Sequence, residues 1–155
     1  MHRFTIFADY FQVVLMDERS GEPFPETWSA DALDRMLVVG KSVASIGTLR
    51  NVDVPVEIQV LDAAPALDYS EWDHAVEGSI EVPSGSLVVM SCTGYLPDAP
   101  RVPIASGTYQ LVFLARGLGT IDDEAGPADN LYRVCSWLGP AQAPNLIKSW
   151  RSANA

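Results

Sequence analysis

The stretch DHAVEGSIEVPSGSLVVMSC, residues 73–92, carries the clearest fold signal in the chain. Residues 73–82 alternate between apolar and polar side chains, which is the two-residue period of a strand with one buried face. The Pro-Ser-Gly sequence at 83–85 has the turn chemistry that reverses a chain, and residues 86–92 follow as a strand that is apolar on both faces. We therefore predict a hairpin whose first strand lies near a sheet edge and whose second strand lies nearer the sheet centre.

Similar strand patterns occur on both sides of this hairpin. Further strands are predicted over residues 3–18, 42–48, 54–61, 108–116 and 131–138, with a hairpin connection at 50–53. Together they favour a mainly β fold, an antiparallel β-sandwich of seven to eight strands, over a β-barrel, which the same pattern also fits. No repeat or linker divides the sequence, so we expect a single domain over residues 1–155.

The sequence predicts one short amphipathic helix, over residues 29–39. Ser29 is a suitable N-cap, and the acidic Asp31 falls in the first turn, where the helix dipole favours it. Gly40 stands where a glycine commonly ends a helix. The apolar residues at helical spacing, which we expect to pack on a sheet, are Ala32, Leu33, Met36 and Leu37.

Hydrophobic runs and cysteines indicate the compartment. No run approaches the roughly 20 apolar residues of a membrane helix, and Asp9 interrupts the first apolar stretch before it reaches signal-peptide length. Cys92 and Cys135 lack metal-binding spacing, and each falls in an apolar segment typical of a buried free cysteine. We expect a reduced, cytoplasmic protein that does not bind a membrane. A disulfide between the two cysteines stays open as an alternative.

The charge balance narrows the class of partner. Twenty acidic residues face ten basic ones, which gives a formal net charge of −10 and a pI near 4.4. Such a field repels phosphate groups, so we do not expect the protein to bind nucleic acid or an anionic membrane. The acidity either attracts a basic partner or simply keeps the protein soluble.

No motif of the common hydrolases or nucleotide-binding enzymes is present. His2 lies at a terminus, and His74 falls on the apolar face of its predicted strand, where a packed, hydrogen-bonded histidine is expected rather than a metal ligand. Glu77 and Glu81 share one strand face about 13 Å apart, too far for a glycosidase pair. We therefore expect no catalytic residue, no cofactor and no metal, and a carboxylate-based hydrolase is the least favoured function.

The loop at 122–129 is the one segment where calcium binding stays open. It holds adjacent carboxylates between two predicted strands, a place where β-sandwich proteins can bind calcium. It lacks the ligand spacing of an EF-hand, however, and a run of adjacent acids is more typical of a solvated loop. The acidic residues of this loop are Asp122, Asp123, Glu124 and Asp129.

Acidic charge is concentrated in the middle of the sequence. Residues 51–100 contain no Lys or Arg. We predict an anionic protein-binding surface here, with Tyr69 and Trp72 as aromatic anchors, that docks a basic protein. The alternative, of equal weight, is that Arg50, Arg101 and Arg133 fold back against these acids and neutralise the surface. The predicted binding residues are Asp62, Asp68, Glu71, Asp73, Glu77 and Glu81.

Several short motifs follow one another along the chain, namely Tyr10-Phe11-Gln12, Thr27-Trp28-Ser29, Leu49-Arg50-Asn51 and Gly107-Thr108-Tyr109-Gln110-Leu111. Over residues 5–115 their order resembles that of the bacterial competence protein J family. This resemblance implies a small intracellular inhibitor that pairs with a secreted or membrane-associated nuclease, and it agrees with the acidic stretch because a nuclease active site is basic. It assigns no binding residue, and the segments 117–130 and 140–155 differ from the family.

Two further possibilities follow from the sequence. A sandwich face or loop cleft with Trp28, Trp72 or Trp137 would make the protein a small-molecule or sugar-binding module, and a pocket lined by aromatic side chains would favour that function. In addition, an uncovered strand edge such as residues 73–82 would allow a homodimer.

Overall fold

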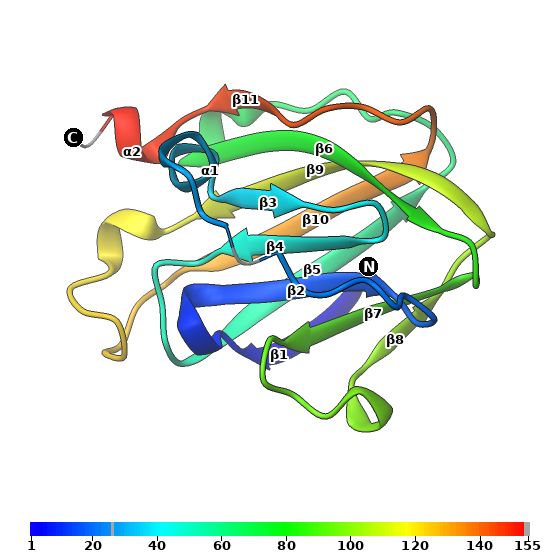
Figure 1. The fold of residues 1–155 in the computed structure, drawn as a ribbon. Coiled ribbons are helices and arrows are strands. Elements are labelled where there is room, and N and C mark those ends of the chain that lie inside the picture. Colours follow the sequence, from blue (N-terminus) through cyan, green and yellow to red (C-terminus); the bar gives the residue numbers. More distant parts are fainter. Residues whose placement is uncertain (26, 154–155) are drawn as a thin grey trace.

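A computed structural model describes residues 1–25 and 27–153, and it shows two packed β-sheets (Figure 1). The first sheet contains, in spatial order, β1 (His2–Phe7), β5 (Asp53–Leu61), β10 (Leu131–Leu138), β9 (Gly107–Arg116), β6 (His74–Val82) and β11 (Asn145–Lys148). The second contains β3 (Leu37–Val39), β4 (Val43–Gly47), β2 (Gln12–Asp17), β7 (Ser86–Ser91) and β8 (Arg101–Pro103). The predicted β-sandwich is confirmed, with more strands than the seven or eight expected.

Short helical segments connect the strands. They are η1 (Asp9–Phe11), α1 (Ala30–Arg35), η2 (Tyr69–Glu71), η3 (Leu96–Asp98), η4 (Leu118–Thr120) and α2 (Trp150–Ala153). The pairings within the sheets are antiparallel except that of β5 with β10, which run parallel with Val56 opposite Tyr132. The sheet is therefore mixed rather than purely antiparallel, because β9 and β10 form a hairpin that is inserted between β5 and β6.

The central strands are apolar on both faces because the structure buries both faces. The largest core cluster lies between the sheets and includes Leu15, Leu87 and Phe113. A second cluster, on the outer face of the second sheet, packs strand residues such as Val88 against Phe24. A third cluster, on the outer face of the first sheet, packs Val112, Leu114 and Cys135 beneath residues 61–72.

Neither predicted hairpin exists as such. The turn at 83–85 carries the chain from β6 in the first sheet to β7 in the second, and residues 48–52 likewise connect β4 to β5 across the sandwich. Asp17 of β2 fixes the first crossing, because its Oδ1 atom accepts hydrogen bonds from the Ser84 N–H and hydroxyl. The turn residues indicated a reversal correctly, but they carry no information on which layer the returning strand joins.

The predicted edge strand is also internal. Residues 74–82 form β6, which pairs with β9 on one side and with β11 on the other. Before β11 begins, the backbone of Gln142 continues the contact by exchanging hydrogen bonds with the Ser79 hydroxyl. The prediction that residues 73–82 form an uncovered edge is therefore wrong, because the C-terminal segment pairs with this strand.

The helix is shorter than the predicted 29–39. Ser29 is the N-cap as expected, with its side-chain oxygen accepting from the Ala32 N–H at 3.2 Å. The helix ends at Arg35 because Met36 adopts a left-handed conformation with φ of 55°, and the next residues form β3 against β4. Gly40 lies in the turn that follows β3, and Leu33 points largely to solvent.

Candidate protein-binding surfaces

The six acidic residues predicted to bind a partner lie around the outer face of the first sheet. Asp62, Asp68 and Glu71 belong to the connection between β5 and β6, and all three are exposed. Leu67, Tyr69 and Trp72 of the same connection pack onto the sheet and hold it in place. Glu77 and Glu81 lie on β6, and Asp73 directly precedes this strand, all three half-buried.

Four of these carboxylates have partners within the fold. Asp68 accepts a hydrogen bond from the Ser70 N–H at 2.9 Å, which lowers the pKa of Asp68. Asp73 accepts from the Leu118 N–H at 3.0 Å, and Glu77 accepts from the Asn145 side-chain amide at 2.9 Å. Glu81 lies 3.6 Å from the Lys41 ammonium group. These acids therefore help to position loops as well as adding negative charge to the surface.

Basic residues enter this surface from other parts of the sequence. The guanidinium groups of Arg116 and Arg133 lie 5.2 and 5.1 Å from the centre of the Trp72 ring, and Trp72 is only 5% exposed. Trp72 is therefore not an accessible anchor, contrary to the prediction. Lys148 donates a hydrogen bond to the Tyr69 carbonyl oxygen at 3.2 Å. The outer face of the first sheet thus carries mixed charge.

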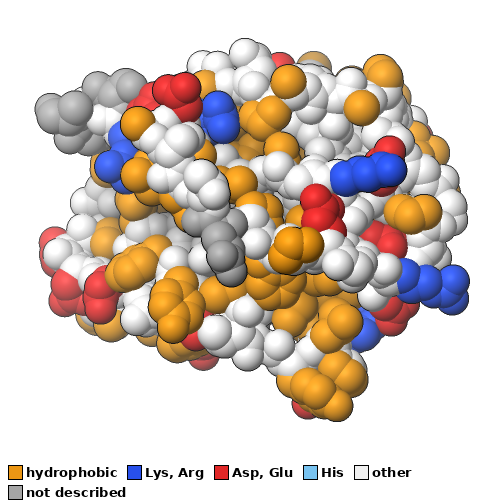
Figure 2. All heavy atoms as spheres, viewed as in Figure 1, with side chains coloured by type: hydrophobic (Ala, Val, Ile, Leu, Met, Phe, Trp, Pro, Cys, Tyr) orange, Lys and Arg blue, Asp and Glu red, His pale blue; other side chains and the backbone are white. Residues whose placement is uncertain are grey.

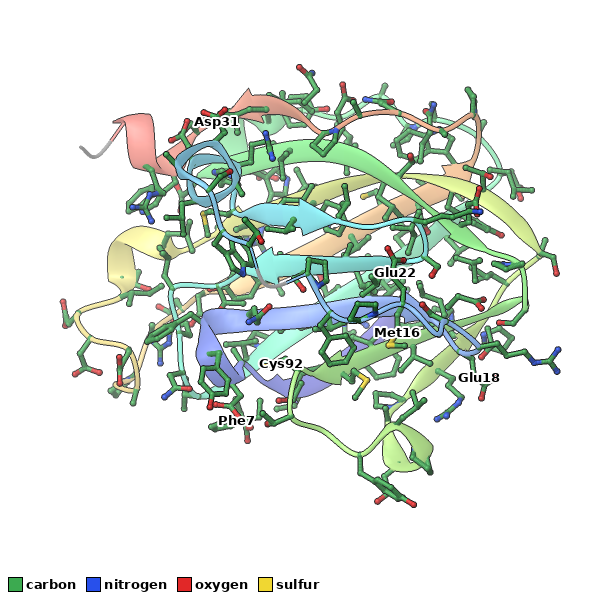
Figure 3. All side chains as sticks on the ribbon, in the orientation of Figure 1. Phe7, Met16, Glu18, Glu22, Asp31 and Cys92 are labelled. Carbon is green, nitrogen blue, oxygen red and sulfur yellow. The ribbon has the colours of Figure 1, made fainter. Side chains whose placement is uncertain are left out.

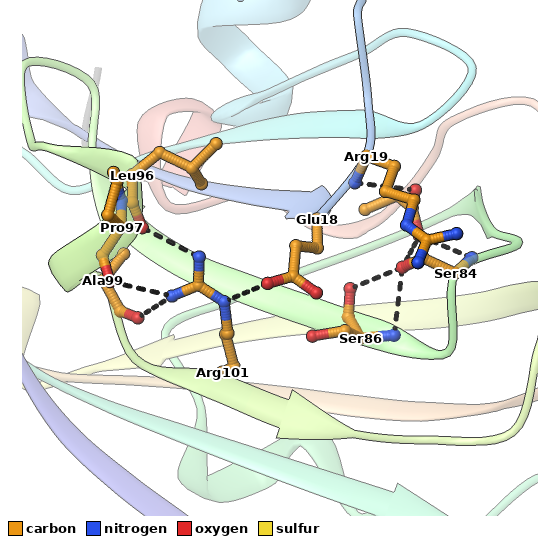
Figure 4. Close-up of polar contacts among 9 residues, drawn as sticks. Glu18, Arg19, Ser84, Ser86, Leu96, Pro97, Ala99 and Arg101 are labelled. Atoms are coloured by element: carbon orange, nitrogen blue, oxygen red, sulfur yellow. Dashed lines mark hydrogen bonds and ion pairs between the residues drawn. The ribbon is translucent and has the colours of Figure 1, made fainter.

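The three arginines that could have neutralised the acidic stretch 51–100 have separate structural roles. Arg133 donates two hydrogen bonds to Glu57, whereas Arg50 donates to the carbonyl of Gly126. Arg101 of β8 pairs with Glu18, which follows β2, and also donates to carbonyls at residues 96–99 (Figure 4). The hydrogen bond from Arg101 lowers the pKa of Glu18. Of the three, only Arg133 lies against the predicted binding surface.

A second candidate surface is an aromatic groove at one end of the sandwich. Here a cavity of about 340 Å³ opens between η1, the segment before α1, α1 itself and the turn after β4. Its exposed side chains include Tyr10 at 68%, Phe11 at 45% and Leu33 at 42%. The residues that line it, which we call the aromatic groove, are Tyr10, Phe11, Trp28, Leu33, Met36, Gly47, Thr48, Leu49 and Arg151.

An adjoining cavity of about 450 Å³ shares Tyr10 and Trp28 with the aromatic groove. It extends across the second sheet to Phe24 and Cys92. Figure 2 shows hydrophobic side chains on this face near η1 and α1, with acidic side chains on the loop after η4. Of the residues that line these two cavities, only Trp28 was predicted from the sequence as a pocket residue.

The backbone of the aromatic groove is unusual. Among the described residues, the non-glycine residues with positive φ are Tyr10, Phe11, Met36 and Leu49, with φ between 53° and 63°. All four line the aromatic groove. This left-handed region is uncommon for residues with a side chain, and for large ones it reflects a local constraint. The hydrophobic and turn patterns of the sequence do not predict this conformation.

The remaining residues considered for chemistry have structural roles. His74 is 2% exposed, and its Nε2 atom lies 2.7 Å from the Arg35 carbonyl oxygen, while its Nδ1 atom accepts from the Trp150 N–H at 3.1 Å. Cys92 and Cys135 are both free thiols, so the alternative disulfide is absent. The expectation of a packed histidine is confirmed.

The acidic loop shows no calcium geometry. Asp123 turns back on its own loop and accepts hydrogen bonds from the Ala125 and Gly126 N–H groups, which lower the pKa of Asp123. Among residues 1–25 and 27–153, no three or more His, Cys, Asp or Glu side chains are grouped to hold a metal ion. Within the same residues, no helix has the length and apolarity needed to cross a membrane.

Comparison with known proteins finds similarity in fold. No family model and no curated protein sequence matches the chain. The crystal structure of ComJ, inhibitor of the DNA degrading activity of NucA, from Bacillus subtilis, superposes with a TM-score of 0.70 at 14% identity, over 90% of this chain and 96% of ComJ. The protein of crocagin biosynthetic gene J superposes with a TM-score of 0.56 at 18% identity, over 90% and 96% of the two chains. The resemblance inferred from the sequence motifs is thus confirmed at the level of fold: this chain has the ComJ fold.

Proposed function

We propose that this protein is an inhibitor that binds a basic protein, of which a nuclease is the favoured kind, and that it is not an enzyme. The observation that carries the proposal is the ComJ fold, spanning nearly the whole chain, combined with a net charge of −10. A nuclease must attract the phosphate backbone of DNA with positive charge, so an anionic protein surface competes directly for the same groups.

The distribution of charge supports a basic partner. Among residues 1–25 and 27–153, the exposed acidic residues outnumber the exposed basic ones, which are Arg3, Arg19, Lys41, Arg116, Lys148 and Arg151. The exposed acids are Asp31, Asp53, Asp62, Asp68, Glu71, Asp98, Asp122, Asp123, Glu124 and Asp129. We propose that the acids around the outer face of the first sheet, namely Asp62, Asp68, Glu71, Asp73, Glu77 and Glu81, contribute to partner binding, chiefly by steering a cationic protein toward the complex.

The test is affinity capture followed by a nuclease assay. The purified protein is immobilised, incubated with a lysate of its source cells at about 0.05 M salt and washed with a rising salt series, which weakens charge-based contacts progressively. We expect one basic protein to be retained and then released by moderate salt. Its DNA-degrading activity should fall to background when the inhibitor is added back in equimolar amount.

Two results would contradict the proposal. One is that no basic protein is retained at the lowest salt. The other is that the retained protein degrades DNA equally well with and without a molar excess of the inhibitor. The charge reversals Glu77→Lys and Glu81→Lys test the acids of the first sheet. Asp98→Lys on η3, which reverses an acid outside that sheet, is their matched control for general charge effects.

The aromatic groove favours a second function, the binding of a small molecule. A cavity of about 340 Å³ lined by Tyr10, Phe11 and Trp28 has the size and lining of a small-molecule site. Arg151 in the same lining would suit an anionic group on such a ligand. Trp72 and Trp137, the other tryptophans considered for this function, lie away from this groove, against the first sheet.

A further inference from the structure

We infer that the aromatic groove is the docking site for a partner's apolar side chain that is flanked by Lys or Arg residues. This inference rests on the proposed function, because it takes the partner to be a basic protein. It assigns the anchoring contact to the end of the sandwich that holds η1, α1 and the turn after β4, rather than to the acidic stretch 62–81.

The first argument is exposed apolar area. Tyr10, Phe11 and Leu33 are large side chains that the fold leaves substantially in water, and all three border one cavity. Large aromatic residues grouped around a pocket are typical of the few contacts that dominate the affinity of protein complexes. On the first sheet, by contrast, the corresponding aromatic residue Trp72 is already buried under two arginines.

The second argument is backbone conformation. A left-handed residue with a side chain is disfavoured by about 1–2 kcal/mol, and glycine would avoid that cost. The fold nonetheless places Tyr10, Phe11, Met36 and Leu49 in this conformation, from three different segments, around one cavity. Conformations of this kind cluster at functional sites, where they aim side chains that a relaxed backbone would direct elsewhere.

The third argument is charge complementarity around the groove. Asp9 precedes Tyr10 and accepts a hydrogen bond from its N–H, so a carboxylate borders the groove beside η1. Asp31, on the first turn of α1, points away from η1 and adds nothing to this side (Figure 3). On another side, the turn after Leu49 contacts the acidic loop, because the Asn51 N–H donates to the Glu124 carbonyl at 2.8 Å. Cationic residues that flank an apolar anchor would meet carboxylates on these sides.

Arg151 distinguishes this docking mode from an anionic small molecule. It is the one Lys or Arg among the described residues that line the groove. A basic peptide is repelled by this guanidinium group, so Arg151→Gln should leave its binding unchanged or strengthen it. An anionic ligand uses the same group as its partner, so the substitution should weaken its binding.

The experiment is an NMR titration of the full chain with three short probes. The probes are acetyl-Lys-Trp-Lys-amide, its acidic counterpart acetyl-Glu-Trp-Glu-amide, and acetyl-Lys-Gly-Lys-amide, which lacks the apolar anchor. We expect the first probe alone to shift the amide resonances of Tyr10, Phe11 and Leu49 in a saturable manner. Its affinity should fall at least about threefold in Tyr10→Asn, since asparagine tolerates the left-handed backbone but lacks the ring.

Two variants complete the design. Leu33→Ser removes a second exposed groove side chain and should weaken the same probe, whereas Tyr95→Asn removes an equally exposed tyrosine from the segment before η3 and should not. The inference is overturned if the acidic probe binds more tightly and loses affinity in Arg151→Gln, or if the basic probe shifts resonances of the first sheet instead of the groove.

The outcome is separable from that of the proposed function. If the basic probe binds the groove but the capture experiment yields no basic protein, the nuclease-inhibitor function fails and the groove stands. If a nuclease is captured and inhibited equally by the wild-type protein, Tyr10→Asn and Leu33→Ser, the groove inference fails and the function stands.

Discussion

Single residues show where local sequence determines local structure and where it does not. The N-cap Ser29 and the buried His74 were both predicted correctly, because each depends on a few neighbouring residues. The left-handed conformations of Tyr10, Phe11 and Leu49 had no such local signal. The backbone there pairs with a distant segment, since the Thr48 N–H donates to the Phe11 carbonyl oxygen at 2.9 Å. Trp28 was therefore the only groove residue predicted as a pocket residue, although Tyr10, Phe11 and Leu49 occur in the motifs that resemble the competence protein J family.

The cost of the left-handed backbone can be measured at Tyr10. Its side chain is 68% exposed and loses little packing when removed, so Tyr10→Gly should leave the free energy of unfolding unchanged or raise it by up to about 1 kcal/mol. Tyr95 is 70% exposed but has φ of −88°, so Tyr95→Gly should lower the same quantity by about 0.5–1 kcal/mol. Urea denaturation of both variants checks the difference, and a larger loss at Tyr10 than at Tyr95 would contradict it.

His74 should make stability depend on pH. Burial lowers the pKa of His74, and its Nδ1 atom must stay unprotonated to accept the Trp150 N–H. As the pH falls, the unfolded chain therefore takes up the extra proton before the folded chain does. The contribution of neutral His74 to the free energy of unfolding is complete above about pH 6.5, and it is lost as the pH drops toward the folded pKa. The slope in this window should disappear in His74→Leu and persist in the control His2→Gln. Denaturation midpoints between pH 7.5 and 5 measure it, and an unchanged slope in His74→Leu would exclude this group as the cause.

At the scale of elements, strand positions were predictable and their pairing was not. The alternation of residues 73–82 located β6 well, but the sequence could not show that β7 joins the other sheet or that β11 covers β6. Residues 61–72 and Phe24 cover the outer faces of the sheets, so β7 and β9 are apolar on both sides wherever they lie in their sheet. Hydrophobicity therefore carried no information on strand order.

Glu57 joins three adjacent strands, and its two partners should differ in strength. Burial raises the pKa of Glu57, but hydrogen bonds from Arg133 and Arg3 outweigh this effect and hold it below its usual value. The Arg133 side chain is 28% exposed and that of Arg3 is 72% exposed. Arg133→Gln should therefore lower the free energy of unfolding by about 1–3 kcal/mol, and Arg3→Gln by less than about 0.5 kcal/mol. Chemical denaturation at pH 7 compares them, and equal losses would show that both pairs are solvent-screened.

At the scale of the whole molecule, the net charge is the property that follows most directly from the sequence. Composition gives the value of −10, and of the nineteen acidic residues that the structure describes, ten are exposed and seven are half-buried. The fold also interleaves Arg116, Arg133 and Lys148 with the acids of residues 62–81, which no local pattern revealed. The overall field is thus predictable from the sequence, whereas the boundaries of a binding surface are not.

The field and the groove should act on different rate constants of complex formation. Glu77→Lys and Glu81→Lys each change the net charge by two units beside the first sheet, so each should slow association with the captured basic partner several-fold at low salt. This effect should shrink as the salt concentration rises, because exposed charges are screened over about 10 Å at 0.1 M. Asp98→Lys makes the same charge change on η3 and should slow association less.

Tyr10→Asn should instead accelerate dissociation, since it removes a short-range contact without changing the charge. Surface plasmon resonance over a salt series separates the two rates. If Glu77→Lys and Asp98→Lys slow association equally, the net charge alone steers the partner and residues 62–81 form no specific contact.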